Sequence, residues 1–130
     1  MHALIIEQDA WIVLMIEDVL RDLGYTSVDV ASSGAEAISA ARLRCPDLIT
    51  SALRLGDSNG IETLRTICPR DETPVVLVTS TGWEARRRAS GLAVVQKPFG
   101  ASELKAAIGK AVAHPGGLDC GSPTPVPGPA

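Results

Sequence analysis

The chain has 130 residues, of which 45% are hydrophobic, and this size and composition predict one domain with a single buried core. Its net charge of -3 argues against a nucleic-acid-binding surface, which needs a concentrated basic patch, and no apolar stretch approaches the roughly 18 residues of a membrane span. Cys45, Cys68 and Cys120 lack the spacing of a disulfide framework or a zinc site, so we expect reduced thiols in a cytoplasmic protein.

Short apolar runs alternate with segments of helical periodicity along the whole chain. This alternation predicts an α/β, doubly wound fold with a central five-stranded parallel sheet. The predicted strands cover residues 3–6, 27–31, 47–51, 74–79 and 93–96, and the predicted helices cover 10–23, 34–44, 60–68, 83–89 and 101–113. The expected end signals are N-caps at Asp9, Ser33 and Ser102, a left-handed Gly24 after the first helix, and Pro69 after the third.

The last part of the chain has a different composition. From Pro115 onward, "PGGLDCGSPTPVPGPA" is rich in Pro and Gly and has little apolar area to bury. We therefore expect a folded domain over residues 1–114 and a flexible tail over residues 115–130, with no output domain after the last helix.

Polar side chains follow several of the predicted strands. Glu7 and Gln8 follow the first strand, Ala52 follows the third, Thr79 ends the fourth, and Lys97 follows the fifth. In an open parallel α/β sheet, ligands bind at the carboxyl ends of the strands, near the point where the strand order reverses. We expect these five side chains to lie together at that edge.

Four motifs carry a family resemblance when they are taken in order. They are "ALIIEQDAWI", "CPDLITSALRLGDSNGIE", "PVVLVTS" and "VVQKPF". On these motifs, residues 3 to about 113 resemble the receiver (response regulator) domains of two-component signalling, which have a flavodoxin-like fold. The segment between Thr79 and Lys97 is shorter than in most receivers, which implies a shortened fourth helix. The chain is similar in this respect to the alphaproteobacterial subgroup with a Phe-Ala-Thr-Gly-type motif, which reads "LVTSTGW" here.

The resemblance also implies a phosphorylation pocket, and this chain departs from it at two positions. The family uses an aspartate nucleophile after the third strand, two acidic residues that hold Mg²⁺, a Thr or Ser, and a Lys. Ala52 stands at the nucleophile position and Gln8 at the second acidic position, whereas Glu7, Thr79 and Lys97 follow the family pattern. We expect no catalytic residue, weak or absent Mg²⁺ binding, and a Lys97 that bonds Glu7.

These features predict a stand-alone pseudo-receiver, not an enzyme, that acts by protein-protein interaction without phosphorylation at position 52. The expected partners are a histidine kinase, a phosphotransfer protein or another response regulator, and a homodimer is an additional expectation. The alternative is a phosphoacceptor in a phosphorelay, in which Ala52 is an engineered replacement or another residue is modified. A third alternative is a small-ligand sensor that uses the vacated pocket.

Four residues are candidates for partner contacts. On a helical wheel, Trp11 and Leu14 fall among charged residues, opposite a predicted buried stripe that includes Leu23. Trp83 is either a surface contact near the short fourth helix or a core residue over the crevice. Val94 occupies the family's aromatic switch position, so a threonine-aromatic switch is not expected.

Other polar residues have simpler explanations. Asp9 is a metal ligand or a helix cap, and its place before Ala10 favours the cap. Thr79 and Lys97 are either relics satisfied by local hydrogen bonds or parts of a conformational switch. Residues 57–60 read as a turn, and His2 and His114 are expected to be exposed.

Overall fold

The computed structural model describes residues 1–56, 58–67, 73–88 and 91–114. Within these ranges no helix is both long and apolar enough to cross a membrane. The predicted ends of the third and fourth helices at Cys68 and Ala89, the stop at Pro69, the turn residue Asp57 and the tail over 115–130 lie outside the described residues.

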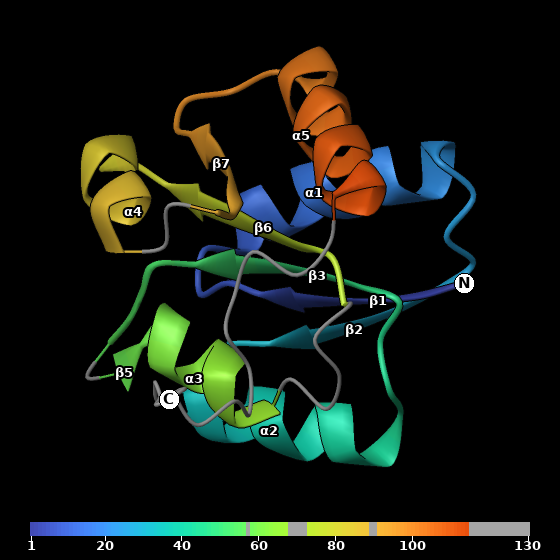
Figure 1. The fold of residues 1–130 in the computed structure, drawn as a ribbon. Coiled ribbons are helices and arrows are strands. Elements are labelled where there is room, and N and C mark those ends of the chain that lie inside the picture. The colour runs from blue at the N-terminus through green and yellow to red at the C-terminus, as the bar shows by residue number, and fades with distance from the viewer. Residues whose placement is uncertain (57, 68–72, 89–90, 115–130) are drawn as a thin grey trace, which may run out of the picture.

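The central sheet has five parallel strands in the order β2-β1-β3-β6-β7, which confirms the predicted doubly wound, flavodoxin-like fold. Helices α1 and α5 cover one face, α2 and α3 cover the other, and α4 lies beside the β6–β7 end (Figure 1). The strands are β1 (His2–Ile6), β2 (Ser27–Ala31), β3 (Leu48–Ala52), β6 (Val75–Thr79) and β7 (Ala93–Gln96). The helices are α1 (Ala10–Asp22), α2 (Gly34–Leu43), α3 (Gly60–Ile67), α4 (Gly82–Arg88) and α5 (Ala101–Ala113).

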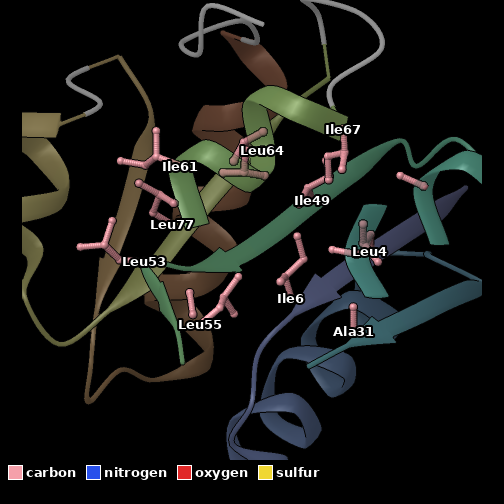
Figure 2. Packing of buried hydrophobic residues seen from close by; sticks show 14 of the residues in the cluster. Leu4, Ile6, Ala31, Ile49, Leu53, Leu55, Ile61, Leu64, Ile67 and Leu77 are labelled. Atoms are coloured by element: carbon pink, nitrogen blue, oxygen red, sulfur yellow. The ribbon is translucent and has the colours of Figure 1, made fainter. Parts of the chain in front are cut away.

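The core has two layers because the sheet is covered on both faces. Leu4 and Ile6 of β1 point into the layer under α2 and α3, where Figure 2 shows them close to Ile49 and Ala31. Ala3 and Ile5 alternate to the opposite layer, under α1 and α5. Every residue of β1, β3 and β6 is buried, which explains why apolar residues fill most of their positions on both faces.

The helix ends follow the predicted caps with one exception. Asp9 Oδ1 accepts a hydrogen bond from the Trp11 amide at 2.9 Å, and Ser33 Oγ accepts one from the Glu36 amide at 3.1 Å. Gly24 adopts a φ of 96°. The prediction that Ser102 caps the last helix is wrong, because α5 already begins at Ala101. There the Gly100 amide donates to Glu103 Oε1 at 2.7 Å.

A short antiparallel hairpin follows β3 and was not predicted. It pairs β4 (Arg54–Leu55) with β5 (Ser58–Asn59), and Gly56 in its turn has a φ of 63°. Asn59 then caps α3, because its side-chain oxygen accepts from the Ile61 amide at 2.8 Å. Strands of two residues carry no periodicity, so the sequence indicated only a turn.

The expectation that His2 is exposed is also wrong. Its side chain is 3% exposed, and it bridges Ser27 Oγ at 2.8 Å and Asp29 Oδ2 at 3.1 Å. The β1–β2 register places His2 opposite Ser27, so these contacts depend on strand pairing and not on sequence proximity. His114 is exposed, as predicted.

The chain's one tyrosine provides a test of core integrity at alkaline pH. Burial and, to a smaller extent, the nearby Asp47 carboxylate raise the pKa of Tyr25 above its ordinary value of 10.0. A raised pKa means that the folded state holds the phenolic proton more tightly than the unfolded chain does. The resulting stabilisation is present below pH 10.0 and is lost as pH rises through the higher, folded-state value.

We therefore expect ultraviolet absorbance to show a tyrosine ionisation midpoint above pH 10.0 in the folded protein, and a lower midpoint in urea. Tyr25→Phe should reduce the alkaline loss of stability. A midpoint that is the same in the folded and urea-unfolded states would contradict the burial argument.

Candidate functional site

The carboxyl ends of β1, β3 and β6 bring three of the predicted site residues together. Ile6 pairs with Ser51, and Ala52 pairs with Val78, so Glu7, Ala52 and Thr79 end neighbouring strands. All three are buried. The sheet order reverses between β1 and β3, which is where ligand crevices form in folds of this type.

Lys97 completes this group from the end of β7. Its Nζ lies 3.4 Å from Glu7 Oε1 and 3.5 Å from Glu7 Oε2. The Lys97 backbone amide donates to the Thr79 carbonyl at 2.8 Å, and Glu7 Oε2 accepts from the Asp9 amide at 3.1 Å. The predicted Glu7–Lys97 contact is therefore present, and the positive charge of one side chain balances the negative charge of the other.

Removing one member of this ion pair is expected to cost more stability than removing both. Lys97→Met leaves the buried Glu7 carboxylate without its cation and should lower the free energy of unfolding by about 1–3 kcal/mol. The double variant Glu7→Gln/Lys97→Met should lie within about 1 kcal/mol of the original protein, because no unpaired charge remains. Urea unfolding of the full double-mutant cycle measures both values.

The matched control is Lys105→Met. Lys105 contacts Asp22 at 3.2 Å in an exposed ion pair, which should contribute less than about 1 kcal/mol. Equal effects of Lys97→Met and Lys105→Met would contradict a special role for the ion pair of the buried Glu7.

Ala52 presents only a methyl group at the position where a nucleophile was expected, and its two hydroxyl neighbours lie in different environments. Ser51 Oγ donates to the Ala52 carbonyl at 2.9 Å. Thr50 Oγ1 is buried and has no hydrogen-bond partner within the described residues. It lies in the strand interior, and neither of its strand partners, Ile5 and Val76, is a base that could activate it.

Thr79 starts a chain of polar contacts that reaches the β4–β5 hairpin. Its Oγ1 accepts from the Thr81 amide at 3.1 Å and lies 3.2 Å from Thr81 Oγ1. Thr81 Oγ1 donates to Glu84 Oε1 at 3.3 Å, and Arg54 Nη2 donates to Glu84 Oε1 at 2.7 Å and to Oε2 at 2.6 Å. The sequence did not indicate Arg54, Thr81 or Glu84, because α4 and the hairpin meet only in the folded chain.

The side chains of Glu7, Gln8 and Asp9, which follow β1, do not suit Mg²⁺, because this ion prefers several carboxylate and water oxygens. Within the described residues, no group of three or more His, Cys, Asp and Glu side chains is placed to hold a metal. Gln8 is exposed, and its side-chain nitrogen lies near Gly56, about 3.3 Å from where a β-carbon would stand. Asp9 caps α1, and Glu7 already contacts Lys97.

The partner-contact candidates occupy two separate surfaces. Trp11 and Leu14 on α1 are 72% and 57% exposed, and Trp83 on α4 is 62% exposed, so Trp83 is a surface residue and not a core residue. Val94 is partly buried and packs against the core. Leu23 is also exposed, because it forms the C-cap of α1 rather than extending its buried stripe.

A flavodoxin-like sheet with Glu7, Thr79 and Lys97 at its strand ends defines the receiver class of signalling domains. Residues 3–109 match the response regulator receiver domain. The chain belongs to this family, whose members receive signals in two-component systems.

Similar proteins include complete receivers and longer regulators. The transcriptional regulatory protein PdtaR of Mycobacterium tuberculosis is 33% identical over 117 residues, which cover 87% of this chain and 57% of PdtaR. The chain therefore spans little more than half the length of that relative. The chemotaxis protein CheY of Thermotoga maritima is 27% identical over 114 residues, which cover 84% of this chain and 95% of CheY.

Among solved structures, the receiver domain of the Erythrobacter litoralis PhyR response regulator has a TM-score of 0.76 and 29% identity. The match covers 96% of this chain and 95% of that domain. Similarity to PhyR-type receivers fits the atypical subgroup indicated by the short segment between Thr79 and Lys97.

Proposed function

We propose that this receiver domain transmits signals by protein contacts and is not phosphorylated at position 52. The proposal rests on the residues at the end of β3. There the buried Ala52 replaces the acceptor, and the neighbouring Glu7 is already paired with Lys97. A methyl group cannot attack phosphorus, so the central step of the family's chemistry has no nucleophile at this position.

The charge of the pocket supports the same conclusion. In an intact receiver pocket, clustered carboxylates repel one another and favour a divalent cation. Here Glu7 lies beside Lys97, and Gln8 adds no charge. The pocket therefore gains little from Mg²⁺, and we expect weak or absent magnesium binding.

The polar contacts around α4 give a second argument. The Thr79 hydroxyl is engaged by Thr81, and Glu84 ties α4 to Arg54 of the hairpin. These contacts hold α4 in place without a phosphoryl group. A domain held in this way presents one arrangement of its surface, which suits a constitutive binding module.

The expected partners are cytoplasmic proteins of two-component systems: a histidine kinase, a phosphotransfer protein or another response regulator. Competition with an intact receiver for such a partner would let this domain modulate a pathway without any enzymatic chemistry of its own. The exposed Trp11 and Leu14 on α1 are the first residues to substitute in a binding assay.

Intact mass spectrometry after incubation with Mg²⁺ and acetyl phosphate tests the proposal. We expect no mass change, while a conventional receiver in the same buffer gains one phosphoryl group. A hydroxylamine-labile phosphoryl adduct on this chain would reveal another carboxylate acceptor and support the phosphorelay alternative. Tight magnesium binding in a titration would separately contradict the proposed charge balance.

A further inference from the structure

The two exposed tryptophans belong to surfaces of opposite charge. Trp11 is 72% exposed on α1, and Trp83 is 62% exposed on α4. Tryptophan is rarely left so open on a small domain, and large exposed apolar groups with a polar rim are typical of protein-protein contacts. The charged residues around each tryptophan indicate what each surface would bind.

The surface around Trp11 is a shallow, open depression whose described lining residues all come from α1, and we call it the α1 groove. Its lining residues are Trp11, Leu14, Met15, Glu17, Asp18 and Arg21. Arg21 contacts Glu17 at 2.9 Å, whereas Asp18 has no ion pair within the described residues. The α1 groove is therefore apolar with a net negative rim.

The surface around Trp83 is positively charged. Arg86 and Arg87 follow Trp83 by three and four positions, so they lie on the same side of α4, and both are exposed. We call these three residues the α4 face. The helix's carboxylate, Glu84, is largely buried against Arg54 at 2.6 Å, and no carboxylate of the described residues forms an ion pair with Arg86 or Arg87.

We propose that the α4 face of one molecule docks into the α1 groove of a second copy of this chain. A tryptophan flanked by arginines has the composition of an interface hot spot, and the α1 groove offers apolar side chains and the carboxylate of Asp18 for such a residue set. Both halves of this complementary pair are present in the one sequence, which favours a second copy over an unrelated partner.

The contact uses two different surfaces of the molecule. It is therefore heterologous, and each molecule keeps one unused surface after the first contact forms. The Arg54–Glu84 ion pair supports the contact because it fixes α4 and limits the ordering cost of binding. This inference goes beyond the proposed function and does not depend on the residue at position 52.

Analytical ultracentrifugation of the full chain over a wide concentration range tests the proposal. We expect the average mass to rise with concentration at low salt and to fall when salt is added, because the rims carry opposite charges. Trp11→Ala and Trp83→Ala should each weaken association at least about tenfold, and Arg87→Glu should do the same without removing a tryptophan. Leu43→Ala, at another exposed apolar residue, should have no effect.

A mixing experiment identifies the two surfaces. The Trp11→Ala variant keeps its α4 face, and the Trp83→Ala variant keeps its α1 groove, so an equal mixture should associate more tightly than either variant does alone. Circular dichroism confirms that both variants are folded. A monomer at every concentration, insensitivity to either tryptophan substitution, or no association in the mixture would each overturn the proposal.

Discussion

The double variant Gln8→Asp/Ala52→Asp is expected to accept a phosphoryl group from acetyl phosphate in the presence of Mg²⁺. Position 52 ends β3 beside Glu7 and Thr79, and Lys97 approaches the same edge from β7. An aspartate at position 52 would supply the attacking oxygen, and a second carboxylate at position 8 would add a metal ligand. The pocket would then have Mg²⁺ and the Lys97 ammonium group to neutralise the charge on the phosphoryl group during transfer.

The single variants separate the two missing functions. Ala52→Asp should be phosphorylated roughly tenfold or more slowly than the double variant, because Gln8 is a poor ligand for magnesium. Gln8→Asp alone should not be phosphorylated, since it lacks the nucleophile. Intact mass spectrometry over time gives the rates, and hydroxylamine treatment distinguishes an acyl phosphate from a phosphoester.

Removing Lys97 from the double variant provides the matched control. Lys97→Met in that background should abolish most of the gain, because the ammonium group would no longer stabilise the phosphoryl oxygens. An unmodified double variant that remains folded would mean that the pocket geometry, and not only the two residues, has departed from that of active receivers.

Gly60→Ala is expected to be the most destabilising single methyl addition in the described part of the chain. A β-carbon on Gly60 would stand 2.0 Å from the carbonyl oxygen of Ala52, which is backbone and cannot rotate away. The start of α3 would have to move off the end of β3, and its hydrogen bond from the Gly60 amide to the Leu53 carbonyl at 2.7 Å would be strained. We expect a loss of about 3 kcal/mol or more in the free energy of unfolding.

Gly109→Ala is the matched control. Gly109 lies within α5, and nothing outside the adjoining backbone of that helix stands within 4 Å of an added β-carbon among the described residues. Alanine should stabilise the protein there by about 0.5–1 kcal/mol, because glycine is a poor helix former. Urea unfolding of both variants measures the difference, and a Gly60→Ala protein as stable as the original would contradict the close approach of α3 to Ala52.

The fold was largely predictable because the apolar runs, the helical periodicity and the helix caps all indicated the same order of strands and helices. The parallel sheet followed from the continuous apolar runs, and Asp9 and Ser33 marked helix starts correctly. Ser102 was wrong because α5 begins one residue earlier, at Ala101, which places Ser102 inside the helix, and the Glu103 carboxylate accepts from the Gly100 amide at the helix start. The exact first residue of a helix is decided by backbone geometry that local sequence patterns do not specify.

The site residues were predictable for a different reason. Parallel strands bring their carboxyl ends to one edge, so Glu7, Ala52 and Thr79 had to meet once the strands were recognised. The absence of a reactive group at position 52 was visible in the sequence itself, since Ala52 has only a methyl side chain. The exposure of Trp11 and Leu14 followed from helical periodicity.

Contacts between segments far apart in the chain required the tertiary structure. The Arg54–Glu84 ion pair, the burial of His2 against Ser27 and Asp29, and the surface position of Trp83 depend on how α4, the hairpin and the strand register come together. The sequence determined a parallel α/β receiver domain without its acceptor, because strand and helix periodicity and residue chemistry are local properties. Only the folded chain decided which polar groups pair, because side-chain partners are set by packing and register.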